Sequence, residues 1–269
     1  MSKVVRDYFD KRATPFDAIY LNESAISRWV NTRFRRAIYD RFHIALRASG
    51  SIENKTVLDV GCGSGRYVVE YAKQGARRVV GVDLSPVMLD LARRLATQQG
   101  VRAKCEFFQE DFFEVLLDEK FDIVLAMGVF DYVERPDTFL ERMVYFSNGL
   151  VIASFPGKSI LRMRLRRLRY RVRNCPIFFY SESEVREIAH RAGLENCSLV
   201  FIPHSGTGYV LVGQVERFRI PSEDQALCLP ESRVRDVREA ESLLKEKEGK
   251  TAMGESQGRR TVLDDSGLS

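Results

Sequence analysis

The sequence predicts an α/β fold in which a seven-stranded, mostly parallel sheet carries helices on both faces. Three observations predict it. The strand candidate Thr56–Val60, apolar enough to be buried on both faces, runs directly into a glycine-rich turn. Strand-like apolar runs then alternate with amphipathic, helix-like runs, which makes neighbouring strands parallel through crossover helices. The last two strand candidates are joined by the short link 204–208, which suits an antiparallel hairpin, because a parallel pair needs a crossover of about a dozen residues or more.

The chain is expected to have three parts. Residues 1–50 are predicted to form helices that cap the sheet, and 51–220 to form the sheet domain. One face of a long helix in the first part is apolar: Ile26, Val30, Phe34 and Ile38. The last part, 221–269, is polar and charged, so we expect it to be largely disordered and regard it as a candidate protein-binding tail.

Seven segments have the apolar, β-branched character of strands. In chain order they are Thr56–Val60, Arg78–Asp83, Ala103–Gln109, Phe121–Gly128, Gly149–Phe155, Leu194–Pro203 and Tyr209–Glu216. Helices are predicted between them at Pro86–Gln99 and Pro136–Ser147, because proline is well placed in the first turn of a helix and Ser85 can cap the first of the two.

Composition excludes several classes of protein. The chain of 269 residues is 45% hydrophobic, which is enough for one domain with a substantial core. It has no run of about 18 apolar residues and no apolar leader near its charged start, so we expect a cytoplasmic protein without a membrane span. The five cysteines are scattered and never form a CxxC pair, which argues against a disulfide framework and against a zinc site.

The glycine turn narrows the choice of ligand. Gly61, Gly63 and Gly65 permit positive φ and let a ligand approach bare backbone. A dinucleotide site places a further glycine five positions after the first, but Arg66 stands there. The pattern is instead GxGxG with Asp59 two residues before the first glycine, and it resembles motif I of the class I S-adenosylmethionine-dependent methyltransferases.

The resemblance spans roughly Ile52 to Glu216 and implies S-adenosylmethionine as the cofactor, in a Rossmann-like methyltransferase fold. It implies that Asp83 accepts hydrogen bonds from the ribose hydroxyls, and that Asp111 accepts one from the adenine amino group, with Phe112 beside the ring. Simpler roles stay open, since Asp111 can cap a following helix and Phe112 can be core packing. The implied cofactor-binding set is Asp59, Gly61, Cys62, Gly63, Asp83, Leu84, Asp111, Phe112 and Met127.

The methyl acceptor is less legible. Where many small-molecule methyltransferases that resemble this chain have a Glu-His pair, Asp131 and Tyr132 stand instead. These two residues and His204 are the candidates for orienting an acceptor or receiving its proton, although Asp131 and Tyr132 can also simply stabilise a helix start. The sequence marks of nucleic-acid-methylating and metal-dependent catechol-type enzymes are missing. We therefore expect no metal and no nucleic-acid partner, and a small-molecule acceptor whose reacting atom is oxygen in preference to nitrogen or carbon.

A non-catalytic, methyltransferase-like protein that acts through a bound partner is the alternative function. Both functions would use the same cofactor site, so they are distinguished by whether the protein turns over a methyl acceptor.

The net charge of +5 is local, because eight basic residues and no acidic one lie between Lys158 and Arg173. A narrow apolar stripe at helical spacing runs through this segment: Leu161, Leu165, Leu168 and Val172. We therefore predict that 158–180 is a basic amphipathic lid inserted in the domain. Three roles are open: a solvated lid, a clamp for an anionic acceptor, or attachment of 158–173 to an anionic membrane surface that carries a lipid-like acceptor. Our hypothesis is that it serves an anionic or amphiphilic acceptor.

Overall fold

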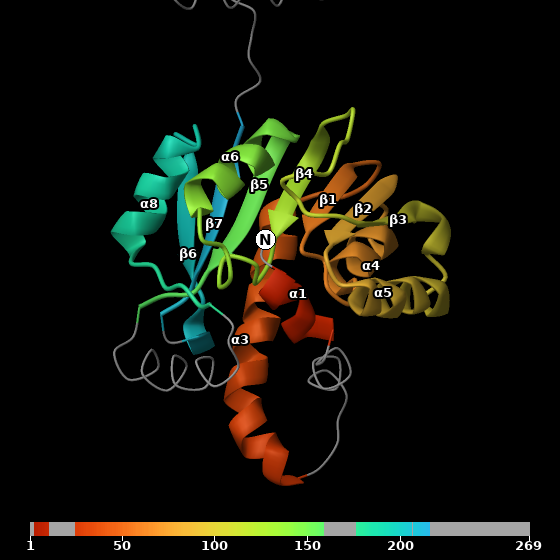
Figure 1. Cartoon of the computed structure of the whole chain (residues 1–269), viewed down its shortest axis with the longest axis horizontal. Helices are drawn as coiled ribbons and strands as arrows, with labels where there is room; N and C mark the ends of the chain where they lie inside the picture. The colour runs from red at the N-terminus through yellow and green to blue at the C-terminus, as the bar shows by residue number, and fades with distance from the viewer. Residues whose placement is uncertain (1–2, 11–24, 159–175, 206, 216–269) are drawn as a thin grey trace, which may run out of the picture. The chain divides into compact units, whose positions relative to one another are not determined.

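The structure is a computed structural model that describes residues 3–10, 25–158, 176–205 and 207–215 (Figure 1). The chain divides into two units, Met1–Arg217 and Phe218–Ser269, and every described residue belongs to the first. The expected tail, 221–269, and most of the expected lid, 159–175, therefore lie outside the described residues, as does the whole of 11–24 between the two N-terminal helices.

The sheet has seven strands in the order β3-β2-β1-β4-β5-β7-β6. Neighbouring strands are parallel from β3 to β5, while β7 is antiparallel to both β5 and β6. This order confirms the predicted α/β class and the predicted C-terminal hairpin. Its strands are β1 (Thr56–Val60), β2 (Arg78–Asp83), β3 (Cys105–Gln109), β4 (Phe121–Ala126), β5 (Ser147–Phe155), β6 (Cys197–Phe201) and β7 (Tyr209–Gln214).

Several strand boundaries differ from the prediction for local reasons. The start predicted for β3 at Ala103 is wrong, because Arg102–Lys104 forms a short 3₁₀ helix, η2, in which Arg102 Nη1 donates to the Cys105 carbonyl at 2.6 Å. The start predicted for β6 at Leu194 is also wrong. The Leu194 amide donates to the Ala189 carbonyl at 2.9 Å and closes the end of the preceding helix, so the strand begins later.

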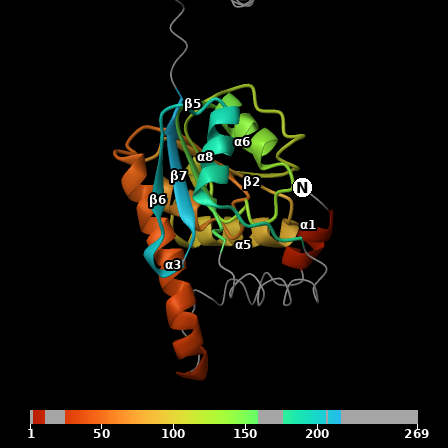
Figure 2. The ribbon, with the colours of Figure 1, turned by 90° about the vertical axis from the view of Figure 1, so that its left-hand side faces the viewer.

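Helices cover both faces of the sheet and create two apolar cores. One core joins the strands to α3 (Ala25–Ser49), α4 (Arg66–Lys73) and α5 (Pro86–Gln98), and the other joins them to α6 (Pro136–Tyr145) and α8 (Glu182–Arg191). Figure 2 shows α3 on one side of β5 to β7, with α6 and α8 on the other. Strand β4 feeds both cores, since Ile123 and Leu125 face one and Val124 and Ala126 face the other, as the period of two in a strand requires.

The helix starts follow their capping residues. Ser85 caps α5 by accepting from the Met88 amide at 3.1 Å, ahead of Pro86 in the first turn. At α8, the Ser181 hydroxyl and the Glu184 carboxylate each accept from the other residue's amide, which forms a capping box. None of the described helices is long and apolar enough to cross a membrane.

The N-terminal part contributes two described helices, α1 (Lys3–Asp10) and α3. Helix α3 packs on β5, on β7 and on the 3₁₀ helix η3 (Pro203–Ser205), while α1 packs on α5. A buried polar contact ties α3 to the domain, because the Ser49 hydroxyl lies 2.6 Å from the Tyr71 hydroxyl of α4 and donates to the Ala45 carbonyl at 2.9 Å. The predicted domain boundaries themselves stay a prediction.

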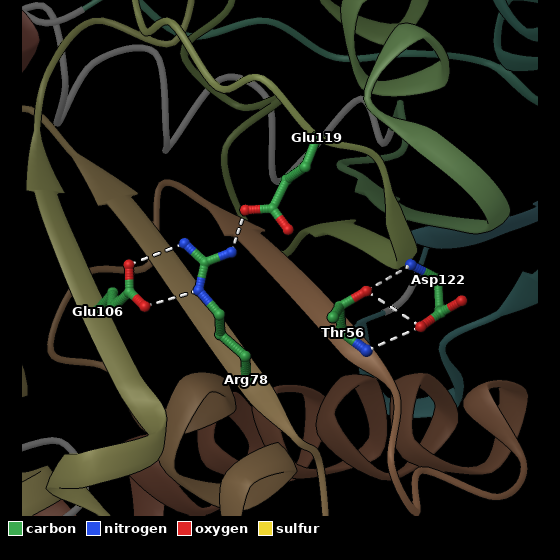
Figure 3. A network of polar contacts seen from close by, with 5 residues as sticks. All are labelled: Thr56, Arg78, Glu106, Glu119 and Asp122. Atoms are coloured by element: carbon green, nitrogen blue, oxygen red, sulfur yellow. Dashed lines mark hydrogen bonds and ion pairs between the residues drawn. The ribbon is translucent and has the colours of Figure 1, made fainter. Parts of the chain in front are cut away.

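Polar side chains fix the amino edge of the sheet (Figure 3). The Asp122 carboxylate accepts from the Thr56 amide at 2.8 Å and from its hydroxyl at 3.0 Å, and so joins the starts of β1 and β4. Arg78 on β2 forms a bidentate pair with Glu106 on β3, at 2.6 and 2.8 Å, and a further pair with Glu119. With the starts of four strands held in register, their carboxyl ends line up at the opposite edge.

Candidate cofactor and acceptor site

The site predicted from the sequence lies at the carboxyl edge of the sheet, around β1. The chain passes from β1 outward to β2 and β3, and then returns to place β4 and β5 on the other side of β1. In open α/β sheets, ligands bind outside the carboxyl ends of the strands at this change of direction. The predicted residues that follow β1, β2 and β4 therefore meet at one place in the fold.

The three glycines of the turn after β1 serve two purposes. Gly61, Gly63 and Gly65 have φ of 68°, 52° and 76°. A Cβ on Gly61 would lie 2.5 Å from Cγ2 of Val129, and a Cβ on Gly65 would lie 2.7 Å from Cβ of Ala92 on α5. A Cβ on Gly63 would meet nothing within 4 Å. Two glycines thus allow close packing, while the middle one presents bare backbone to open space.

This difference predicts unequal losses of stability for two alanine variants. Gly63→Ala and Gly65→Ala should each lose about 1–2 kcal/mol to left-handed backbone strain. Gly65→Ala should lose roughly 1–3 kcal/mol more, because its methyl group collides with α5. Gly63→Ala, although more stable of the two, should weaken S-adenosylmethionine binding. Urea unfolding and calorimetric titration measure the two effects, and equal stability of the variants would contradict the steric account.

Asp83, the last residue of β2, organises the turn. Its carboxylate accepts from the Gly63 amide at 2.8 Å and from the Ser85 amide at 2.9 Å, and the Leu84 amide also stabilises its charge. Burial raises the pKa of the Asp83 carboxyl, while these three amides act in the opposite direction. Asp83 therefore ties the glycine turn to the start of α5. Leu84 beside it is half-buried.

Asp59, two residues before the first glycine, is a buried carboxyl with an unsatisfied oxygen. The residue is 1% exposed, and within the described part of the chain its Oδ2 has no hydrogen-bond partner. Burial, together with the charge of Asp83, raises the pKa of Asp59 to about 8. Buried polar atoms of folded proteins are nearly always paired, so an unpaired oxygen here indicates a ligand that supplies a donor.

Cys62 fills space inside the turn. It is 7% exposed, and its Sγ lies 2.8 Å from the position that a Cβ on Gly81 would take. Burial and the charges of Asp83 and Asp59 raise the pKa of the thiol well above its ordinary value, so it stays protonated. The described cysteines, Cys62, Cys105 and Cys197, are all free thiols.

Asp111 and Phe112 follow β3 and make structural contacts. Asp111 Oδ1 accepts from the Phe113 amide at 3.0 Å, which holds the turn after the strand. The Phe112 ring is 5% exposed and packs against the rings of Phe139 and Phe146 at centroid distances of 4.9 and 5.9 Å. Core packing is thus observed for Phe112, whereas Asp111 holds a turn and caps no described helix; the expected contacts of both residues with adenine stay predictions.

Two residues near the site were missed from the sequence. A Cβ on Gly128, which follows β4 and Met127, would lie 2.8 Å from Nη1 of Arg41 on α3. The Arg41 guanidinium thus lies against the backbone next to Met127, which is 8% exposed. On α1, Asp10 accepts from the Ser85 hydroxyl at 2.5 Å, beside Asp83. No local pattern marks Arg41 or Asp10, because each reaches the site through the packing of a separate helix.

Two candidate acceptor residues lie beside the stem of the expected lid, which is the hydrogen-bonded backbone of 156–158 and 178–180. Asp131 is 9% exposed, Tyr132 is half-buried, and the Asp131 carbonyl accepts from the Phe178 amide at 2.9 Å. The Tyr180 amide donates to the Pro156 carbonyl at 2.9 Å, and the Lys158 amide donates back to the Tyr180 carbonyl at 3.1 Å. Lys158 and Phe178, on either side of the expected lid, thus lie at the carboxyl edge, and Phe178 is next to Asp131.

His204 lies in η3, within the link between β6 and β7. The link reaches the same edge, since Tyr209 of β7 pairs with Phe155 at the end of β5, and Thr207 Oγ1 donates to the Gly157 carbonyl at 3.0 Å. The backbone of the link that contains His204 is thereby held near the stem. Across the described ranges, no three His, Cys, Asp or Glu side chains gather at a spacing that could hold a metal ion.

Comparison with known proteins identifies the same region. The family described as "Methyltransferase domain" matches residues 57–146. The chain is 35% identical over 129 residues to the ubiquinone biosynthesis O-methyltransferase of Pasteurella multocida, covering 44% of this chain and 52% of that protein. It is 30% identical over 144 residues to norajmaline N-methyltransferase of Rauvolfia serpentina, covering 52% and 47%. The chain thus spans about half the length of these curated relatives.

Among solved structures, magnesium protoporphyrin IX methyltransferase of Synechocystis PCC 6803 with bound SAH has the same fold. The TM-score is 0.63 at 20% identity, and the match covers 78% of this chain and 98% of that one. A second structure of that protein, with bound SAM, gives a TM-score of 0.59 at 21% identity and covers 78% and 95%. Both likenesses concern the fold.

Proposed function

Because this chain belongs to the class I S-adenosylmethionine-dependent methyltransferases, we propose that it binds S-adenosylmethionine and transfers its methyl group to a small-molecule acceptor. The observation that carries the proposal is the glycine turn together with two carboxyls, the buried Asp59 before it and the half-buried Asp83 that accepts from its Gly63 amide. A Cβ on Gly63 would meet nothing within 4 Å, so the backbone there is accessible, and Asp59 Oδ2 has no hydrogen-bond donor among the described residues. Both features fit a cofactor that brings an ammonium group, ribose hydroxyls and an apolar base.

The residues proposed to hold the cofactor divide by chemistry. Asp83 would bind the ribose hydroxyls, and Asp59 the cationic methionine part. The Arg41 guanidinium, against Gly128 and close to Met127, would pair with the carboxylate of the same methionine part. Asp59 would thus face the ammonium group and Arg41 the carboxylate of the methionine part. Because the two protein charges have opposite signs, they would orient the cofactor in one direction only.

The cofactor supplies a methyl carbon bound to a positive sulfur, which is an excellent leaving group. The chain's own task is to align the acceptor, exclude water and receive a proton where the acceptor carries one. Asp131, Tyr132 and His204 are the proposed groups for this proton, and oxygen is the proposed acceptor atom. The relatives include proteins named as O- and N-methyltransferases, so this preference rests on the residues of the site.

An anionic or amphiphilic acceptor is the proposed substrate class. The support is that the flanking residues Lys158 and Phe178 lie at the carboxyl edge, where Phe178 contacts Asp131, and that the sequence has eight basic residues between Lys158 and Arg173. Neutralising Arg164, Arg167 and Arg171 together should raise the KM for the acceptor or release the protein from anionic vesicles. No change in either assay would rule out this substrate class.

Binding and turnover test the proposal separately. Isothermal titration with S-adenosylmethionine and with its demethylated product should show saturable binding of both, whereas NAD should not bind. Mass spectrometry of cell extract treated with the protein and S-adenosylmethionine should then reveal a metabolite heavier by one methylene unit. Tight NAD binding would overturn the choice of cofactor. Cofactor binding without turnover of any metabolite would leave the non-catalytic alternative as the function.

A further inference from the structure

The carboxyls of Asp59 and Asp83 lie on neighbouring strands; Asp59 is buried and Asp83 is half-buried. Asp59 near the end of β1 pairs in register with Gly81 of β2, and Asp83 ends that same strand two residues later. Asp83 has three amide partners, whereas Asp59 Oδ2 has none within the described residues. Two carboxylates on neighbouring strands repel each other, so Asp59, which is the more buried and has fewer partners, is the one that holds a proton.

Among the described residues, the shift in the pKa of Asp59 comes from burial and from the charge of Asp83, with no contribution from a cation. The charge of Asp83 acts on Asp59, and Asp59 in turn acts on Cys62 and on Tyr71 of α4. Other charged groups act on the residues around it: Asp10 of α1 acts on Asp83 and Arg93 of α5 acts on Cys62, while Arg41 of α3 lies at Gly128. Helices α4 and α5 also carry Arg66, Tyr67, Glu70, Lys73, Asp90 and Arg94.

We propose that Asp59 holds a proton in the free protein and releases it to solvent when the cationic methyl donor binds. The inference rests on the proposed function and deepens it. The donor's positively charged ammonium and sulfonium groups would stabilise the charged form of Asp59. Binding and proton release are therefore one coupled equilibrium, and Asp59 makes the affinity for the donor depend on pH.

The direction of the effect follows from the raised pKa of Asp59, about 8 in the free protein. Below that pH the proton must leave for the donor to bind, so the affinity rises with pH by up to about tenfold per unit. Above it, Asp59 is already charged and the affinity levels off. The donor's own amino group titrates at about pH 8 and opposes the rise there, so a reference variant is needed.

Titration calorimetry of the full chain measures the proton directly. S-adenosylmethionine is titrated at pH 7 in phosphate and in Tris, whose ionisation enthalpies differ, and the affinity is measured from pH 6 to 9. The wild type should release close to one proton more than Asp59→Asn, and its affinity should rise with pH. Asp59→Asn should bind with an affinity that lacks this rise, whereas Asp90→Asn, an exposed carboxylate on α5, should behave as the wild type.

Urea unfolding without ligand gives a second measurement that does not depend on binding. A carboxyl whose pKa is raised on folding contributes stability that is lost as pH rises through that pKa. The stability of Asp59→Asn relative to the wild type should therefore increase between about pH 4 and pH 8. Equal proton release by wild type and variant, with a stability difference independent of pH, would overturn the inference while leaving the function intact. Absence of donor binding at every pH would instead refute the proposed function.

Discussion

Replacing Asp83 by alanine is expected to weaken S-adenosylmethionine binding by at least about 100-fold, or about 3 kcal/mol. The variant loses the proposed acceptor for the ribose hydroxyls. It also leaves the amides of Gly63 and Ser85 without the carboxylate that holds them at 2.8 and 2.9 Å, so the glycine turn loses its tether to α5. Isothermal titration measures the loss, and circular dichroism checks that the variant is folded.

Asp90→Ala is the matched control. It removes a carboxylate from the neighbouring helix α5, where Asp90 makes only an exposed pair with Arg93 at 3.0 Å. Such pairs contribute less than about 1 kcal/mol to stability, and Asp90 is not among the residues proposed to hold the cofactor. The control should bind the cofactor as the wild type does. A folded Asp83→Ala variant with wild-type affinity would show that β2 does not contribute to the site.

Gly157→Ala is expected to destabilise the protein by roughly 3–5 kcal/mol. A Cβ at this position would lie 1.3 Å from the Thr207 carbonyl oxygen, which is part of the backbone and cannot rotate away. The stem of the basic segment and the link between β6 and β7 would have to separate, with loss of the hydrogen bond from Thr207 Oγ1 to the Gly157 carbonyl. Urea denaturation measures the change.

Gly213→Ala provides the comparison within the same sheet. A Cβ there would meet the two terminal carbons of the Leu194 side chain at 3.1 Å, and a flexible side chain can shift by a few tenths of an ångström. This variant should therefore lose less than about 1 kcal/mol. Similar stability of the two variants would mean that the approach of Thr207 to Gly157 is not a tight one.

The order of elements could be predicted because its signals are local. Alternation of apolar runs gives strands and helices, and Ser85 followed by Pro86 gives the start of α5. The glycine turn and the acid that ends β2 also lie where the family pattern places them. Residues that depend on one strand and the turn after it were accessible to sequence reasoning for that reason.

The remaining features depend on tertiary packing. Arg41 meets Gly128 only because α3 crosses to the end of β4, and Asp10 meets Ser85 only because α1 packs on α5. The direction of the Phe112 ring is likewise set by Phe139 on α6, so the sequence left its role open between a ligand contact and the core. Neither separation along the chain nor periodicity carries this information.

The backbone at 156–158 is hydrogen-bonded to the backbone at 178–180. The chain between these two points can therefore be regarded as a module whose length can be changed. Its ends are already joined by hydrogen bonds between Pro156, Lys158 and Tyr180, so altering the length of the module changes little of the loop-closure entropy, about 0.6 kcal/mol for a doubling. The donor half of the site, around β1 and β2, is built from other elements. A graft or deletion between residues 158 and 178 is therefore expected to leave the residues proposed to hold the methyl donor in place.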